Sequence, residues 1–125
     1  MILVDTSIWV DHLRGNDLTL AGLLNSGLAL AHPCVIAELA LGHLRQRDRV
    51  LEALLDLPHA LTATDGEVLH FIDRHKLGGR GIGYVDVHLL ASTRLTAGAS
   101  LWTRDQRLQG VAEQLGLSVR LPRPI

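Results

Sequence analysis

The chain has 125 residues, of which 47% are hydrophobic and 20% are charged, and its formal net charge at pH 7 is −1. This composition excludes a disordered chain, and the length fits one domain, residues 1–125, built around one core. The lone cysteine, Cys34, excludes a disulfide framework and fits a reducing cytoplasm, and no apolar run approaches the roughly 20 residues that a membrane-spanning helix needs.

The first half of the chain predicts two short strands and four helices. The apolar run before Asp5 is typical of a buried strand, and Thr6 or Ser7 can cap the helix that follows it. Glycines then separate segments of helical and strand-like spacing. In chain order we expect a strand at 1–4, helices ending at 13 and spanning 17–25, a strand at 28–31, and helices at 33–42 and 46–55.

The second half predicts three strands and three helices. Thr64 and Glu67 have the spacing of a capping box, so a helix should begin between them. Four glycines make 78–83 a loop. We expect a strand at 61–64, helices at 65–76, 85–97 and 105–115, and strands at 99–103 and 117–121. Strands that alternate with helices indicate an α/β fold of three layers, α/β/α, with a central parallel sheet of about five strands.

Four acidic residues occupy notable places in this scheme. Asp5 and Asp105 each follow a predicted strand, and ligand sites in parallel sheets form beyond the carboxyl ends of the strands. Asp86 heads a helix, and Glu38 lies in a strongly apolar one. Four carboxylates gathered at one edge would repel one another unless a cation neutralised them, and oxygen ligands suit Mg²⁺ or Mn²⁺.

Each acid also has a plain structural explanation. Asp5 and Asp105 could serve only as helix caps, since aspartate is a preferred capping residue. Asp86 could simply complement the helix dipole, and Glu38 could lie on a solvated helix face. The argument for a site therefore depends on the four acids together.

The segments around the four acids are 4–9, 35–42, 81–91 and 101–105. In sequence, order and spacing they resemble the motifs of PIN-domain ribonucleases, and within that superfamily the VapC-type toxins of bacterial toxin–antitoxin pairs. The resemblance extends over nearly the whole chain and includes the acid of each of the four motifs.

This resemblance implies a divalent-metal-dependent endoribonuclease that cleaves single-stranded regions of RNA and thereby inhibits translation and growth. Mg²⁺ would be the cofactor, as one or two ions, with Mn²⁺ as a substitute. It also implies a homodimer in the cytoplasm, neutralised by a small VapB-type antitoxin protein. The catalytic and metal-binding residues would be Asp5, Glu38, Asp86 and Asp105, with Thr6 and Thr103 in supporting positions.

The charge balance is compatible with an RNA substrate such as tRNA or rRNA. Setting the four acids aside leaves nine acidic residues against 12 basic ones, and all but one of the basic residues are arginines. The planar guanidinium group suits bidentate contacts to phosphate. Arg80, in the glycine-rich loop, and Arg104, beside Asp105, are the expected phosphate contacts.

Other functions fit less well. A phosphoacceptor receiver domain would need a second acid next to Asp5 and a lysine late in the chain, and a dehalogenase-like phosphatase would need an aspartate where Ser7 stands. No pair of the seven histidines has a metal-binding spacing such as HExxH. A housekeeping RNA-processing nuclease, and a PIN-fold module that binds RNA or protein without cutting, remain the alternatives.

Overall fold

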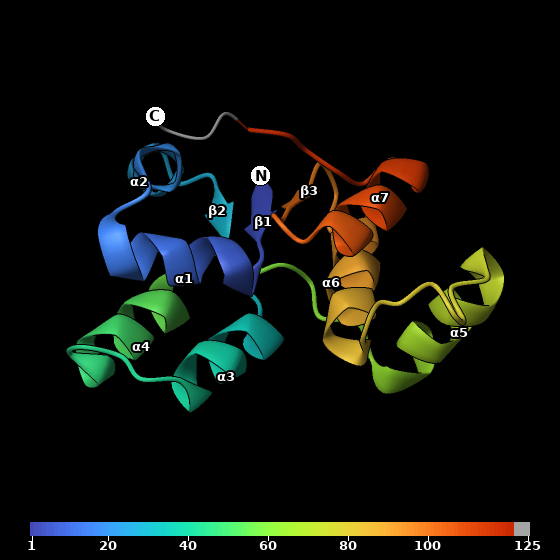
Figure 1. Cartoon of the computed structure of the whole chain (residues 1–125), viewed down its shortest axis with the longest axis horizontal. Coiled ribbons are helices and arrows are strands. Elements are labelled where there is room, and N and C mark those ends of the chain that lie inside the picture. Colours follow the sequence, from blue (N-terminus) through green and yellow to red (C-terminus); the bar gives the residue numbers. More distant parts are fainter. Residues whose placement is uncertain (122–125) are drawn as a thin grey trace.

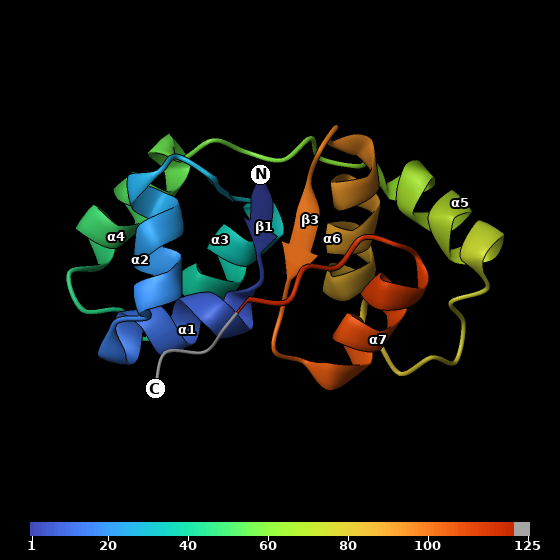
Figure 2. The same cartoon turned by 90° about the horizontal axis from the view of Figure 1, so that it is seen from above.

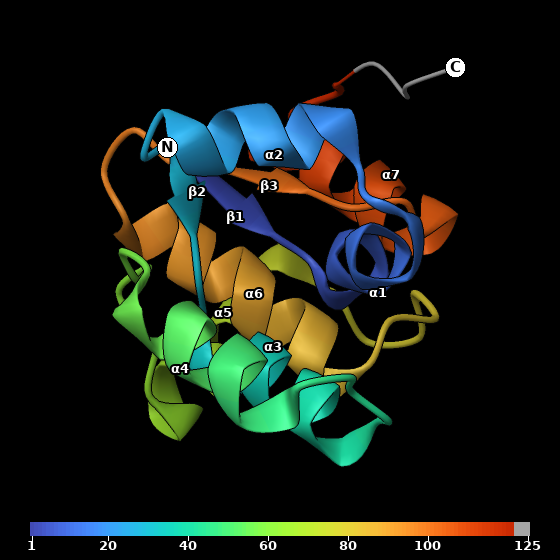
Figure 3. The ribbon, with the colours of Figure 1, turned by 90° about the vertical axis from the view of Figure 1, so that its left-hand side faces the viewer.

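A parallel sheet lies between two layers of helices in the computed structural model, which describes residues 1–121 (Figure 1). The central strand is β1 (Ile2–Val4), flanked by β2 (Ala29–Leu30) and β3 (Ser100–Trp102), and all three strands are parallel. Figure 3 shows α2 above the strands and α6 below them. The predicted three-layer α/β/α architecture is confirmed.

Every predicted helix is present, with ends shifted by a few residues at most. Proline at the first position of α3 and the capping box of α5 mark their starts as the sequence indicates. The helices are α1 (Thr6–Gly15), α2 (Leu18–Asn25), α3 (Pro33–Leu41), α4 (Arg47–Asp56), α5 (Asp65–His75), α6 (Tyr84–Leu95) and α7 (Gln106–Gln114).

The predicted number of strands is wrong, because the sheet of the described residues has three strands and not about five. The segments 61–64 and 117–121 do not form strands. In their place the sheet has two isolated parallel bridges, Ala31 with His59 and Leu101 with Ser118.

Two side chains, one in α6 and one just after it, explain why the segment 61–64 does not form a strand. The backbone N–H groups of Leu61 and Ala63 donate to the hydroxyl oxygens of Thr96 and Ser92, at 2.9 and 3.2 Å. Backbone donors that bond to helix side chains cannot continue a strand ladder. The chain therefore leaves the sheet after a single bridge.

The register of the sheet determines where the chemistry can occur. Leu3 pairs with Leu30 and Leu101, and both Leu3 and Leu101 are fully buried, as expected for a strand covered on both faces. Val4 pairs with Trp102, so β1 and β3 end level with each other. Figure 2 shows the segments after β1 and β3 leaving the sheet at the same edge to enter α1 and α7.

A buried polar network holds α3 against α6. His32, which is fully buried, caps α3 by accepting the backbone N–H of Cys34 at its Nδ1, at 3.0 Å. Its Nε2 lies 2.9 Å from Oγ of Ser92 on α6, and that hydroxyl also lies 3.4 Å from Nδ1 of His88. The network sets the spacing of the two helices that carry Glu38 and Asp86.

No helix among residues 1–121 combines the length and the apolar character needed to cross a bilayer.

We expect His32 to make stability depend on pH. Burial, with smaller effects of His88 and His59, lowers the pKa of His32 from 6.5 to about 4. Between those two values the unfolded chain binds a proton that the folded chain excludes, so stability should fall as the pH drops from about 6.5 to about 4. The loss should be at most about 3 kcal/mol.

Urea unfolding of the His32→Asn variant across this range tests the expectation. Asparagine retains an oxygen that can cap α3 but does not titrate, so the variant should show a flatter pH profile. His43→Asn, which changes an exposed histidine, should keep the wild-type slope. A His32→Asn profile as steep as that of the wild type would contradict the assignment.

Candidate active site

Asp5 is held at the end of β1 by three hydrogen bonds. Its Oδ1 accepts the backbone N–H of Thr6 at 2.8 Å, and its Oδ2 accepts the hydroxyl groups of Ser7 at 3.0 Å and Thr103 at 2.6 Å. Only 7% of Asp5 is exposed. Because Thr103 follows β3, the last of these bonds joins the ends of two neighbouring strands, and the carboxylate cannot rotate freely.

Glu38 is brought to the same edge by Thr6. The Thr6 hydroxyl donates to Oε1 of Glu38 at 2.6 Å, which ties the first turn of α1 to the middle of α3. Glu38 itself is exposed. It does lie on the solvated face of its helix, but its hydrogen bond ties the carboxylate to Thr6, the residue after Asp5.

Asp105 and Asp86 are each fixed at the start of a helix. Asp105 caps α7 by accepting the N–H of Leu108 at 3.0 Å, and its own N–H donates to Oγ1 of Thr103 at 3.1 Å. Asp86, in the first turn of α6, accepts the N–H of Gly83 at 3.1 Å. The single hydroxyl of Thr103 therefore couples Asp5 to Asp105.

The other three acids act electrostatically on Asp86. Burial raises the pKa of Asp86 above its ordinary value, and the negative charges of Asp5, Asp105 and Glu38 raise it further, against the opposing effect of the Gly83 N–H. Charges act on a neighbouring pKa when they lie near it, so the other three acids lie around Asp86. The sheet edge thus gathers all four acids into one anionic site.

The structural and the functional interpretations of these acids turn out to be compatible. Asp5 and Asp105 are indeed helix caps, as the plain explanation has it. The carboxylate of a helix cap is fixed in position by backbone N–H groups. Such fixed oxygens are what a cation site needs, since each keeps further lone pairs for a ligand.

The two arginines predicted to contact phosphate lie in different environments. Arg104 donates to Asp11 at 2.7 Å and to Asp17 at 2.5 Å, and its guanidinium lies 5.5 Å from the centre of the Trp102 ring. These contacts give Arg104 a structural role beside Asp105. Arg80 is exposed and donates to Gln114 at 2.9 Å.

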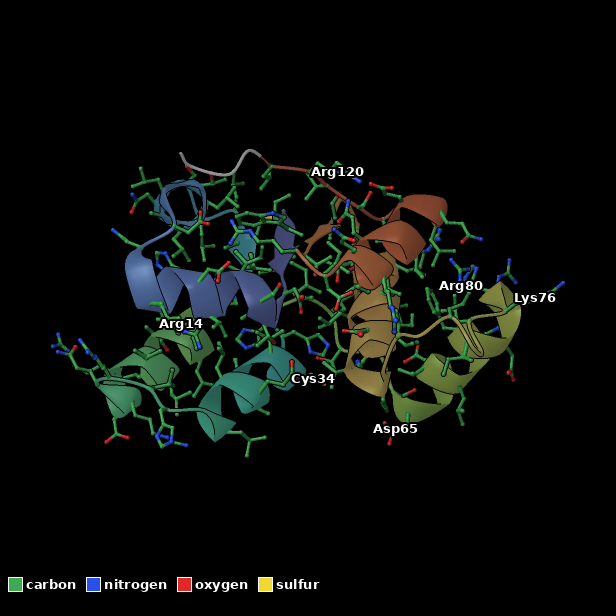
Figure 4. All side chains as sticks on the ribbon, in the orientation of Figure 1. Arg14, Cys34, Asp65, Lys76, Arg80 and Arg120 are labelled. Atoms are coloured by element: carbon green, nitrogen blue, oxygen red, sulfur yellow. The ribbon has the colours of Figure 1, made fainter. Side chains whose placement is uncertain are left out.

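A second group of possible metal ligands was not anticipated from the sequence. Atoms of His32, Cys34 and His88 lie within 4.8 Å of one another. Cys34 is half-buried at the start of α3 (Figure 4), and burial raises the pKa of its thiol, helped by the charges of Glu38 and Asp65. A protonated thiol is a poor metal ligand, and both ring nitrogens of His32 already have partners.

Two contacts in this region could have been inferred from local spacing. Ser7 stands two residues after Asp5, the spacing at which a short hydroxyl side chain bonds an aspartate. His88 and Ser92 are four residues apart on α6 and therefore share a face. Their link to His32 is a long-range contact that no local pattern reveals.

Comparison with known proteins identifies the fold family. A family model described as the PIN domain matches residues 2–114. The chain belongs to the PIN domain family. It is also 49% identical, over 119 residues, to the protein named Ribonuclease VapC32 in two strains of Mycobacterium tuberculosis, CDC 1551 / Oshkosh and ATCC 25618 / H37Rv. That match covers 95% of this chain and 96% of each relative.

No solved structure matches the chain. The predicted PIN domain of VapC type, and the enzyme class of a ribonuclease, are confirmed by the family model and the relatives together. The PIN family match spans every element from β1 to α7, which includes all four acids.

We expect Asp86→Asn to stabilise the metal-free PIN domain. The substitution removes a carboxylate whose pKa is raised by burial and by its acidic neighbours, while the amide oxygen can still accept the Gly83 N–H. Thermal unfolding in EDTA should give a higher Tm than for the wild type. Addition of MgCl₂ or MnCl₂ should raise the Tm of the wild type more than that of the variant.

Asp73→Asn, at an exposed position on α5, is the matched control and should respond to metal as the wild type does. A lower Tm for Asp86→Asn in EDTA would show that the four acids do not repel one another as described.

Arg104→Gln should destabilise the PIN domain by about 1–3 kcal/mol in urea unfolding, because it leaves the buried Asp17 without its cation. Burial alone would raise the pKa of Asp17, but Arg104 and the Leu20 N–H hold it below its ordinary value. Arg80→Gln, at an exposed site, should leave stability unchanged. Equal effects of the two substitutions would argue against the structural role of Arg104.

Proposed function

We propose that this PIN-domain protein is a divalent-metal-dependent endoribonuclease that cleaves single-stranded regions of RNA. The observation that carries the proposal is the coupling of four carboxylates, Asp5, Glu38, Asp86 and Asp105, at the carboxyl edge of the sheet. Relatives of 49% identity that are named as ribonucleases support the same activity. We further propose that the enzyme acts in the cytoplasm as a toxin that blocks translation and growth.

The donor set fits a hard cation. All four side chains offer oxygen atoms, which suits Mg²⁺ with Mn²⁺ as a substitute, and the charges of the other three acids raise the pKa of Asp86 beyond the effect of its burial. One or two such ions, held by these carboxylates, would supply an activated water and offset negative charge on the phosphodiester.

The protein's own contribution is to fix the carboxylates before RNA binds. Thr103 and Ser7 hold one oxygen of Asp5, and Thr6 holds Glu38. We propose that Thr6 and Thr103 act as positioning residues in this way. A site whose ligands need no rearrangement loses little free energy when the substrate arrives.

The proposed RNA path begins beside the four acids. Arg80 lies in the loop between α5 and α6, directly before the helix of Asp86, and its guanidinium retains donors beyond its bond to Gln114. We propose that it contacts an RNA phosphate. The RNA would be a tRNA or an rRNA.

Exposed apolar side chains are consistent with binding of protein partners. Leu41, on α3, is 88% exposed and Leu55, on α4, is 61% exposed. We propose that a small antitoxin protein covers this region and the acidic site. We also propose a homodimer, and the groove of about 470 Å³ beside Phe71 and Leu95, between α5 and α6, supports a second interface.

Cleavage of a mixed tRNA and rRNA preparation by the purified chain tests the proposed activity. We expect discrete fragments with Mg²⁺ or Mn²⁺ and none with EDTA. Asp5→Asn should lower the rate at least about 100-fold, because the carboxylate is both a ligand and the link between β1 and β3. Asp73→Asn, an exposed acid away from the site, should cut as the wild type does.

Each outcome has a distinct meaning. Metal-dependent cutting that survives Asp5→Asn would show that the site is elsewhere. A folded protein that cuts no RNA in the presence of either metal would favour the alternative of a PIN-fold module that binds without cutting.

A further inference from the structure

A groove of about 400 Å³ opens beside the acidic site, between α1 and the segment from α3 to α4. Pockets that hold small ligands typically measure about 300–1,000 Å³, so this groove can accept a group of nucleotide size. One end is formed by Glu38, which also belongs to the acidic site. The residues of its wall used below are Val10, Leu13, Arg14, His43 and Arg45.

The groove carries unpaired positive charge. Arg14 and Arg45 are both exposed, and neither forms an ion pair with an acid among residues 1–121. Arg104 and Arg120, by contrast, are bound to acids. Free guanidinium groups present a planar fork of donors that matches phosphate oxygens. The groove therefore favours a polyanion.

The rest of the wall suits a nucleobase. Val10 and Leu13 contribute apolar surface from α1, and the exposed imidazole of His43 lies on the α3–α4 connection. Apolar side chains and histidine rings are the surfaces on which unpaired RNA bases pack. Phosphate donors and base-packing surface thus occur in the same groove.

The helix α1 connects this groove to the acidic site. Thr6, in its first turn, is bonded to Glu38, and Arg14 lies eight residues further along the helix, roughly 12 Å away at about 1.5 Å per residue. Figure 4 shows Arg14 at the end of α1 that faces α4. A strand whose backbone passes the four acids can therefore continue along α1 into the groove.

We propose that this groove binds the RNA segment next to the cleaved phosphodiester, with Arg14 and Arg45 on its phosphates and Val10, Leu13 and His43 around a base. The assignment rests on the proposed ribonuclease function. Its lining favours single-stranded RNA over a protein segment, because the two free arginines share the groove with Glu38, which also belongs to a site that must accept a phosphodiester.

The test compares two double variants with the same loss of charge. Arg14→Gln with Arg45→Gln changes the groove. Arg74→Gln with Lys76→Gln changes exposed residues near the end of α5, on the opposite side of the molecule from Arg14 (Figure 4). Each pair is combined with Asp86→Asn, which we expect to prevent cleavage because it removes one of the four proposed metal ligands. Binding of a fluorescent single-stranded RNA 12-mer of mixed sequence is then measured by anisotropy from 50 to 300 mM KCl.

We expect the groove variant to bind about 10- to 100-fold more weakly than the Asp86→Asn parent. The slope of log K against log salt should fall by about 1.4, as for two lost phosphate contacts on a single strand. The α5 variant should match the Asp86→Asn parent in RNA affinity and in the salt slope. In the Mg²⁺ cleavage assay, with Asp86 restored, the groove variant should show a raised KM with little change in kcat.

The outcomes separate this proposal from the function on which it rests. If the wild type cuts RNA but the groove and α5 variants bind and cut alike, the groove assignment is wrong and the ribonuclease function stands; a protein segment is then the better occupant. If the wild type neither binds nor cuts RNA, both proposals fail.

Discussion

The hydrogen bond between the Thr103 hydroxyl and the Asp5 carboxylate is the contact on which the rest of the site depends. It joins the ends of β1 and β3 at 2.6 Å, and the same Thr103 oxygen accepts the N–H of Asp105. Because Val4 and Trp102 are paired in the sheet, the two acids after these strands must face the same edge. The parallel register and this one hydroxyl group therefore determine where the anionic site forms.

The same residues cap helices and carry the chemistry, which creates a tension between stability and function. Capping by Asp5 and Asp105 stabilises α1 and α7, whereas the burial and the repulsion that raise the pKa of Asp86 destabilise the folded state without a cation. Stability given up at a site in this way is a common feature of proteins whose function needs concentrated charge. The buried link of His32 to Ser92 holds the helices of Glu38 and Asp86 together against that repulsion.

Much of this architecture could be predicted from the sequence because it follows local rules. The capping box at Thr64 and Glu67, the proline that begins α3 and the apolar run before Asp5 all retain their predicted roles. The strand predicted at 61–64 is absent because the hydroxyl groups of Ser92 and Thr96, distant in the chain, accept its backbone N–H groups. The ion pairs of Arg104 could not be predicted for a similar reason, since its partners Asp11 and Asp17 lie far away in the chain. Long-range polar contacts leave no periodic signal.

The separation of Asp5 and Thr103 by 98 positions has a consequence for folding during synthesis. Chains emerge from the ribosome with their N-terminus first. Until the segment that forms β3 has been synthesised, β1 lacks this partner strand and Asp5 lacks the hydroxyl group of Thr103. The hydrogen bond that fixes Asp5 therefore cannot form until the segment that carries β3 and Thr103 has been synthesised.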